Sequence, residues 1–346
     1  MRKFIVAVVL MLGVVFILWR FSEVQAIIDT LQRGDWKFIL LGLFAVAAYI
    51  FSIAACFQSI YRAIGLDEKI INLFPVSAAA IFLSTVAPSG GVSGMAVFVD
   101  EAHKKGYSPV RATVAGALYA VFDYAAFICY LALGLVVLIR RNNLNAGEIS
   151  ASIILVLIAI TLAFLVYLGM KSADQFARVL VWMARLVNRI LRPFTHRAYL
   201  SEQRAYEFAH EASSGLLELE RNPVKLVAPF IITLVKQGIM VILLWLAFLA
   251  FEVKVSPGTV IAGYSIGYLF TLISPTPLGI GFVEGLLSLV LASMYVPLEA
   301  ATVVALVYRA FTLWIPLLIG IFAFRWLQRV SRSIEKQALP GSEKFI

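Results

Sequence analysis

The sequence predicts an all-α, polytopic integral membrane protein, and three observations lead to this fold class. Of the 346 residues, 62% are hydrophobic and 14% are charged, whereas a soluble domain has roughly 45–50% and about 25%. The mean hydropathy is +0.92. The apolar runs are far longer than the roughly 9–11 residues of a membrane-spanning β-strand, which favours helices over a barrel. The same composition excludes a disordered chain and a soluble globular one.

Six apolar runs are interpreted as full membrane spans. They cover residues 4–19, 36–60, 110–139, 149–170, 224–251 and 299–326. The first run follows Arg2 and Lys3 and is interpreted as an uncleaved helix, because it continues without a clear small-x-small end. A cleaved signal peptide, with a faint cleavage site at residues 24–26, is the alternative.

Two further apolar stretches are short and run into motifs rich in proline and glycine. Residues 72–86 number 15, and at about 1.5 Å per residue they reach roughly 22 Å, less than the roughly 30 Å of the hydrocarbon core. The motif PSGGVSG follows at residues 88–94, and residues 257–273 run into SPTPLGIG in the same way. We expect two broken or re-entrant hairpins, which membranes tolerate only where the irregular backbone faces protein or water.

The distribution of lysine and arginine predicts the orientation. Basic residues are concentrated before the first span, around residues 62–69 and 104–111, between 171 and 225, and after the last span. Because Lys and Arg mark the cytoplasmic side, we expect a multi-pass protein of the cell membrane with both termini in the cytoplasm. Residues 104 and 200 are then cytoplasmic, and residues 145 and 297 are external.

The chain resembles itself at a shift of 187–189 residues, which predicts an internal repeat. Matching positions are Pro88 with Pro275, Gly94 with Gly281, Pro109 with Pro297 and Tyr119 with Tyr308. Each half, about 35–140 and 223–328, reads as a span, a broken hairpin and a span. The orientation rule makes the halves inverted, as in transporters with a site near the midplane; chance similarity between apolar helices is the alternative. We expect one transmembrane domain over 1–330 and a cytoplasmic tail over 331–346.

The two motifs supply the first candidate binding residues. These are Pro88, Ser89, Gly90, Gly91, Ser93 and Gly94, together with Pro275, Thr276, Gly279 and Gly281. Exposed backbone N–H groups and hydroxyls in such a motif are able to hold an anion such as a lipid phosphate. The alternative, which composition alone favours, is a tight turn whose small residues allow close helix packing.

Four ionisable residues inside the apolar segments form the second candidate set: Asp123, Lys236, Glu284 and Arg309. Charges in a membrane are costly and usually face a protein interior or a cavity. Asp123 lies near the repeat equivalent of Arg309, and Glu284 follows the second motif, so either acid is a candidate partner of Arg309. The four residues form structural ion pairs or line a polar pathway for a charged headgroup. Neither reading implies catalysis, and no catalytic residue is assigned.

The polar stretch at about 171–223 contains an amphipathic segment at residues 175–191. Apolar residues recur there at helical spacing, with Arg178, Arg185 and Arg189 on the other side. This pattern favours a helix lying on the anionic inner leaflet, with a cytoplasmic helical hairpin together with residues 202–220 as the alternative. Four charged residues follow the first motif: Asp100, Glu101, Lys104 and Lys105. We expect them to form a solvated helix end or, as the alternative, a gate for a lipid headgroup.

Several other kinds of site have no sequence signal. Cys56 and Cys129 both lie inside apolar runs, and the three histidines lack metal-ligand spacing, so neither a metal site nor a disulfide framework is expected. There is no P-loop, and no cofactor is expected. The net charge of +9 reflects the positive-inside bias, and no basic soluble module points to nucleic acid.

The two motifs also resemble the signatures of a known family. STVAPSGGVSG at residues 84–94, followed by Gly106, is similar to the first signature of the lysylphosphatidylglycerol synthase transmembrane-region family, also called flippase-like. SPTPLGIGFVE at 274–284, followed by Tyr308 and Arg309 and by WIP at 314–316, is similar to the second. The resemblance covers about residues 5–325 and adds Tyr308 to the candidate site.

The resemblance implies a bacterial or archaeal protein of the cytoplasmic membrane. In the larger members of that family a soluble C-terminal domain transfers lysine from aminoacyl-tRNA to phosphatidylglycerol, and the membrane part is linked to moving the product between leaflets. The printed sequence ends at Ile346, shortly after the last span, so the transferase activity is not expected of it.

We therefore predict a lipid translocase whose partners are membrane lipids, either an anionic phospholipid or an isoprenoid-linked lipid. An oligomer or a partner from envelope biosynthesis is also expected. The alternatives are an enzyme that acts on a membrane lipid and an accessory subunit of membrane-lipid or lipid-linked glycan synthesis.

Overall fold

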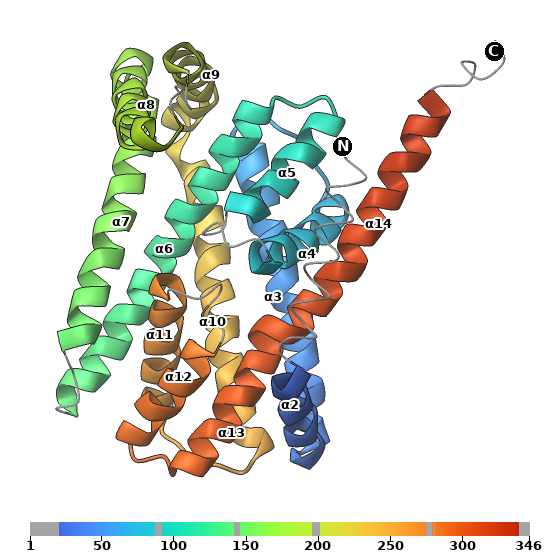
Figure 1. Cartoon of the computed structure of the whole chain (residues 1–346), viewed down its shortest axis with the longest axis vertical. Helices are drawn as coiled ribbons and strands as arrows, with labels where there is room; N and C mark the ends of the chain where they lie inside the picture. The colour runs from blue at the N-terminus through green and yellow to red at the C-terminus, as the bar shows by residue number, and fades with distance from the viewer. Residues whose placement is uncertain are drawn as a thin grey trace. The chain divides into compact units, whose positions relative to one another are not determined.

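The computed structural model describes residues 21–86, 92–141, 146–195, 201–274, 279 and 281–338. The regular structure within these ranges is helical throughout (Figure 1), which confirms the all-α class. Helices long and apolar enough to cross a membrane cover Trp36–Ala63, Pro109–Arg140, Ala146–Lys171, Val224–Ala250 and Leu298–Val330. The sixth expected span, residues 4–19, lies outside the described residues. The first described helix is α2 (Phe21–Arg33).

The two halves of the expected repeat contain the same series of elements. The first half consists of α3 (Trp36–Ala63), α4 (Ile70–Val86), α5 (Val92–Lys104) and α6 (Pro109–Arg140). The second consists of α10 (Val227–Ala250), α11 (Pro257–Ile273), α12 (Phe282–Ser293), α13 (Leu298–Arg309), a π-helical turn (Ala310–Trp314) and α14 (Ile315–Ala338). The short helices also match in length, with 17 residues in both α4 and α11 and 13 and 12 in α5 and α12. The order and lengths agree with the repeat, and its inverted sense stays a prediction.

Proline and serine together determine where two of these helices begin. Pro109 opens α6 and Pro257 opens α11, where a missing N–H leaves no hydrogen bond unmade. The preceding residues are N-caps: Ser108 Oγ accepts from the Arg111 N–H at 3.2 Å, and Ser256 Oγ accepts from the Thr259 N–H at 3.2 Å. Each serine therefore satisfies one of the backbone donors that a helix start leaves unpaired.

Contacts between residues divide the chain into two compact units. The first comprises the described parts of Met1–Ala54, Ile70–Val97 and Gly238–Ile346. Its most extensive helix packing is between α4 and α14, where a Cβ on Gly320 would lie 2.5 Å from the Ala78 carbonyl oxygen. The absent side chain lets the two helices approach closely, and the rings of Phe82 and Phe324 then pack with centroids 5.6 Å apart.

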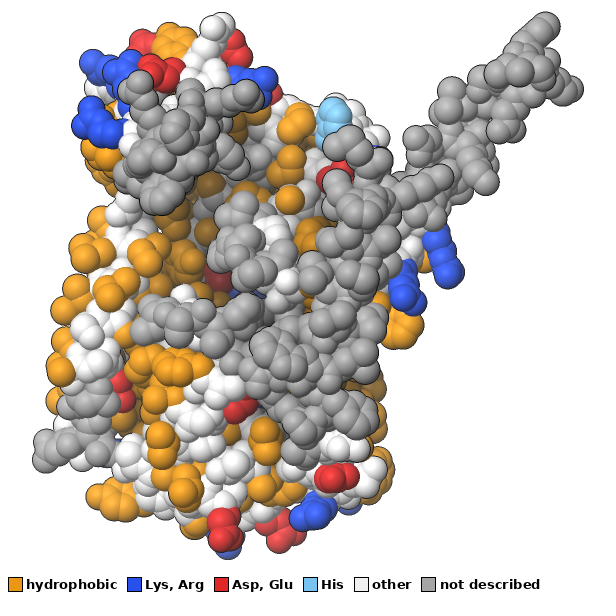
Figure 2. All heavy atoms as spheres, viewed as in Figure 1, with side chains coloured by type: hydrophobic (Ala, Val, Ile, Leu, Met, Phe, Trp, Pro, Cys, Tyr) orange, Lys and Arg blue, Asp and Glu red, His pale blue; other side chains and the backbone are white. Residues whose placement is uncertain are grey.

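The second unit comprises Ala55–Lys69 and the described parts of Phe98–Gln237. In it α7 (Ala146–Lys171) exposes a long row of large apolar side chains, among them Ile153, Leu157, Ile160 and Phe164. Figure 2 shows hydrophobic side chains along this flank, and lysines and arginines gathered at the end where α8 and α9 lie. An exposed apolar surface of this extent is what a lipid-facing helix presents.

The amphipathic segment forms a helical hairpin, which was the alternative expectation, and a position of α8 on the inner leaflet stays a prediction. Here α8 (Ala173–Thr195) packs against α9 (Glu202–Arg221). The reason is that α8 has a second apolar face: Phe176 and Ala184 are buried within the unit, and small residues of α9 such as Ala209 are buried as well. Arg185 and Glu202 join the two helices through a 2.8 Å ion pair.

Candidate functional site

The first cluster of charged residues lies at the start of α12 and the end of α13. Gly281, in the left-handed conformation with φ 76°, caps α12 and allows the sharp entry into that helix. Glu284 occupies the first turn, where a negative charge is favoured by the helix dipole. Arg309 Nε donates to Glu284 Oε1 at 2.7 Å. The two side chains are only 5% and 10% exposed, so this is an ion pair buried within the protein.

The helix changes its hydrogen-bonding period directly after Arg309. The Ile315 N–H donates to the Ala310 carbonyl, five residues back, so Ala310–Trp314 form a π-helical turn. Such turns are frequent at functional sites. Phe311 in this turn packs against α3 so closely that a Cβ on Gly42 would lie 2.3 Å from the Phe311 ring, and the turn is thereby held beside the ion pair.

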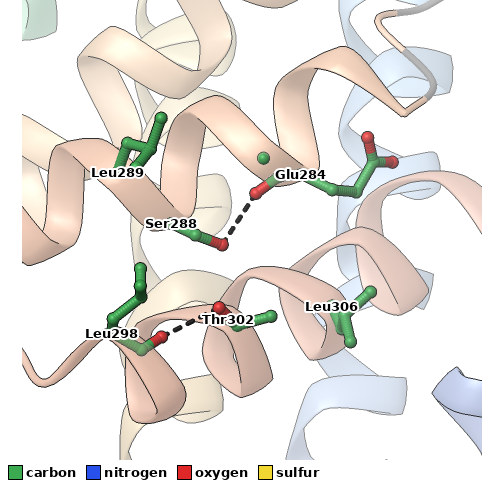
Figure 3. Close-up of a pocket in the computed structure, with 7 residues that line it drawn as sticks. Glu284, Ser288, Leu289, Leu298, Thr302 and Leu306 are labelled. Atoms are coloured by element: carbon green, nitrogen blue, oxygen red, sulfur yellow. Dashed lines mark hydrogen bonds between the residues drawn. The ribbon is translucent and has the colours of Figure 1, made fainter.

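A groove of about 370 Å³ runs between α12 and α13. Its lining residues are Glu284, Gly285, Ser288, Leu289, Leu298, Thr302 and Leu306. Figure 3 shows Leu289 and Leu298 at one end and Glu284 and Leu306 at the other. The groove is therefore apolar at one end, and at the other end it is lined by Glu284, the carboxylate partner of Arg309.

The polar atoms of the groove are arranged as hydrogen-bond acceptors. Ser288 Oγ donates to the Glu284 carbonyl at 2.8 Å, and Thr302 Oγ1 donates to the Leu298 carbonyl at 2.8 Å, as the dashed lines in Figure 3 indicate. Both hydroxyl protons are thus used within their own helices. Among the described residues, the second carboxylate oxygen of Glu284, Oε2, is buried and has no hydrogen-bond partner.

The second charged cluster lies in the other unit, on α6 and the first half of α10. Lys236 Nζ contacts Asp123 Oδ1, and Gln237 Nε2 donates to the same carboxylate oxygen at 2.9 Å. Lys236 Nζ also donates to the Tyr119 hydroxyl at 3.2 Å and lies 5.3 Å from the centre of its ring. The stacked rings of Phe57 and Tyr119 close the cluster on one side.

The structure therefore separates the four intramembrane charges into two pairs. Arg309 pairs with Glu284, and Asp123 pairs with Lys236. Asp123, the partner that repeat symmetry suggested for Arg309, is therefore wrong. Glu284, which its place after the second motif suggested, is confirmed. Tyr308, next to Arg309, is buried. Sequence reasoning missed Gln237 and assigned Tyr119 no role in the cluster. The spacing of Tyr119 and Asp123, four residues apart on one helix face, was a usable signal.

The described part of the first glycine motif serves helix packing. Ser93 Oγ donates to the Leu83 carbonyl of α4 at 3.1 Å. A Cβ on Gly94 would lie 2.1 Å from Ser84 Oγ and 2.8 Å from the Ala80 carbonyl oxygen, so only glycine lets α5 approach α4 this closely. Pro88, Ser89, Gly90 and Gly91 lie outside the described residues.

In the second motif, Gly279 and Gly281 both require a positive φ. Their φ angles are 73° and 76°, a region that side chains other than glycine rarely adopt. A Cβ on Gly279 would also lie 2.2 Å from Val283 Cγ2. These two glycines shape the entry into α12 and thereby position Glu284. Pro275 and Thr276 lie outside the described residues.

The charged residues that end α5 are paired. Lys104 Nζ lies 2.8 Å from Asp100 and also contacts Glu101, while Lys105 Nζ lies 2.8 Å from Glu68. These contacts agree with a charged helix end, and a role as a headgroup gate stays untested. Within the described ranges, no group of three or more His, Cys, Asp or Glu residues is placed to hold a metal ion.

Fold and site together define a polytopic helical membrane protein with ion pairs buried inside helices of membrane-spanning length. The family model of the lysylphosphatidylglycerol synthase TM region matches residues 4–320, and the chain belongs to this family. A UPF0104 membrane protein of Pyrococcus horikoshii is 22% identical over 330 residues, covering 92% of this chain and 96% of the relative. Another, of Methanothermobacter thermautotrophicus, is 20% identical over 299 residues, covering 85% and 87%.

Proposed function

We propose that this protein moves a phospholipid or lipid-linked substrate between the leaflets of the cell membrane. The observation that carries the proposal is the groove between α12 and α13, which has an apolar end and is lined at the other end by Glu284, the buried partner of Arg309. A membrane lipid has the same division, with a hydrocarbon chain and a polar headgroup. The family membership supports a lipid-related role for the membrane part.

The depth of the ion pair suits a translocation pathway. Arg309 is the twelfth residue of the 33-residue segment Leu298–Val330, about 17 Å along the helix from its start. Charged residues at such depth are costly in hydrocarbon and typically mark the path of a polar substrate. The pair Arg309–Glu284 replaces part of the hydration that a headgroup loses as it leaves the interface.

The acceptor-rich lining favours a headgroup that brings hydrogen-bond donors. The hydroxyls of Ser288 and Thr302 donate to their own helices, and Glu284 Oε2 is an acceptor with no described partner. Burying an acceptor without a donor is unfavourable, so an ammonium or hydroxyl group of the headgroup gains a partner here. The guanidinium of Arg309 attracts the phosphate of the same lipid. We propose a phospholipid whose headgroup carries N–H or O–H groups.

Orientation follows from the basic residues. Both termini and the segment 171–225 are proposed to lie in the cytoplasm, because lysines and arginines are concentrated there. The groove between α12 and α13 then belongs to the second half of the repeat, whose hairpin is proposed to enter the membrane from outside. An enzyme of lipid metabolism and an accessory subunit are the competing functions. Neither of them requires that the purified protein alone moves lipids between leaflets.

A leaflet-resolved assay tests the proposal. The purified protein is reconstituted into vesicles that contain tail-labelled fluorescent phosphatidylglycerol, phosphatidylethanolamine or phosphatidylcholine, and exchange is followed by quenching the outer leaflet. We expect protein-dependent exchange of the first two lipids and little of phosphatidylcholine, whose headgroup has no N–H or O–H. Exchange of all three at the rate of protein-free vesicles would overturn translocation. Equal exchange of all three with protein would overturn only the headgroup assignment.

A further inference from the structure

The exposed side of α8 carries two parallel stripes. One stripe is basic and consists of Arg178, Arg185 and Arg189; the other is apolar and consists of Trp182, Met183 and Leu186. All six side chains are exposed, and Trp182 is 61% exposed. A large aromatic residue and two aliphatic ones rarely share an exposed helix face unless that face meets another surface. We call these six residues the α8 outer face.

The position of α8 brings this face to the level of the membrane surface. The spanning helix α7 ends at Lys171, and α8 begins two residues later at Ala173. Figure 1 views α8 nearly end-on while α7 runs along the picture's long axis, so α8 lies across the direction of the span. A helix that starts at the end of a span and turns across it lies parallel to the bilayer plane.

We propose that the α8 outer face docks on the anionic lipid surface of the leaflet next to the end of α7. Trp182, Met183 and Leu186 insert at the headgroup level, and the arginine stripe binds lipid phosphates. Tryptophan prefers this depth because its ring is apolar and its N–H remains hydrogen-bonded. Arginine binds phosphate with a planar fork of donors, and an amphipathic helix with basic residues along an apolar stripe is the usual form of an interfacial anchor.

The hairpin with α9 leaves this face available and adds rigidity. The inner side of α8 is buried through Phe176, Ala177 and Ala184, whereas all six residues of the α8 outer face stay exposed. The Arg185–Glu202 pair neutralises one arginine. Arg178 and Arg189 are therefore the residues through which lipid charge acts most strongly.

Depth-dependent quenching in the full-length protein tests the proposal. The exposed Cys129 is replaced by alanine and the buried Cys56 is kept. A fluorophore is attached at Met183→Cys or, as the matched control, at Glu207→Cys on the exposed side of α9. The protein is placed in nanodiscs of phosphatidylcholine with or without phosphatidylglycerol, and quenching by lipids spin-labelled near the headgroup is measured. We expect at least twofold stronger quenching at position 183 than at 207, increasing with phosphatidylglycerol.

The charge requirement has its own variant. Arg178→Gln with Arg189→Gln should reduce quenching at position 183 in phosphatidylglycerol discs to the value in phosphatidylcholine, without changing the melting temperature by more than a few degrees. Quenching at 183 no stronger than at 207 in anionic discs would overturn the proposal and would indicate that the face awaits a protein partner. The result does not depend on lipid translocation, so the two proposals fail separately.

Discussion

Arg309 and Glu284 lie on consecutive short helices, and the guanidinium Nε of one donates to the carboxylate Oε1 of the other at 2.7 Å, with both side chains buried. The pair stands where the apolar groove between α12 and α13 ends. Its geometry leaves Glu284 Oε2 without a partner among the described residues. A purely structural ion pair is usually satisfied completely, so the open acceptor distinguishes this pair from the closed cluster around Asp123.

Removing one member of this pair should destabilise the protein, and removing both should restore stability without restoring function. Arg309→Met leaves a buried carboxylate without its cation, which costs about 3–5 kcal/mol of the free energy of unfolding. Arg309→Met with Glu284→Gln should recover most of that loss, measured by denaturation in mixed micelles. Arg309→Lys should keep part of the transport. Full transport by the double variant would show that the pair is structural only.

The packing at Gly94 predicts a stability loss on adding a single methyl group. In Gly94→Ala the new Cβ meets the Ala80 backbone carbonyl, which is unable to move aside, as well as the Ser84 side chain. Overpacking of this kind costs about 1–3 kcal/mol. The matched control is Gly285→Ala, where no atom lies within 4 Å of the new Cβ and alanine should stabilise the helix by about 0.5–1 kcal/mol. Equal melting temperatures of the two variants would contradict this account.

The Asp123 cluster should behave as a structural unit. Asp123→Ala leaves the Lys236 ammonium buried without its carboxylate and should lower the free energy of unfolding by about 3–5 kcal/mol. Tyr119→Phe removes one neutral acceptor from the same ammonium and should cost about 1 kcal/mol. Both values come from denaturation in mixed micelles. If Asp123→Ala folds with unchanged stability yet loses transport, the cluster belongs to the pathway instead.

The α8–α9 hairpin should loosen in acid. The hydrogen bond from Arg185 holds the pKa of the Glu202 carboxyl below its ordinary value of 4.5. A depressed pKa means that the pair stabilises the fold above the unfolded pKa and that this contribution is lost as the pH falls through the lower, folded value. The protection factors of residues 173–221 against hydrogen exchange, corrected for the intrinsic pH dependence, should therefore fall below pH 4.5 in the wild type and change less in Glu202→Gln. The same acid response in both proteins would exclude Glu202 as its source.

Topology labelling tests the inverted repeat. Single cysteines at His103 and Glu207 should react only from the cytoplasmic side, and those at Gly147 and Tyr295 only from outside. All four positions are exposed, and Cys129 is again replaced by alanine. Reaction of positions 103 and 147 from the same side would contradict the inverted arrangement.

Much of the fold followed from hydrophobic length and from Pro/Gly interruptions. The apolar stretch predicted at residues 257–273 has the same first and last residues as the helix Pro257–Ile273. Pro257 favours a helix start, and the Pro/Gly motif after the stretch favours a helix end. The hairpin of α8 with α9 was the alternative and not the favoured interpretation. Helical spacing shows which residues of α8 are apolar, but it does not show which of them pack against protein and which against lipid. The partner of Arg309 depended on the angle at which α12 enters, which the left-handed Gly281 determines. The groove was invisible in sequence, because Ser288 and Thr302 are ordinary residues of apolar helices.

The most direct measurement of the central claim is lipid exchange with the groove filled. Gly285 lines the groove, and a Cβ added there meets no described atom within 4 Å, so we expect Gly285→Leu to fold with its longer side chain in the space for the lipid. In vesicles with fluorescent phosphatidylglycerol we predict that Gly285→Leu slows protein-dependent exchange at least tenfold, while Gly285→Ala stays within twofold of the wild type and neither variant melts below the wild type. Wild-type exchange by Gly285→Leu would contradict the account.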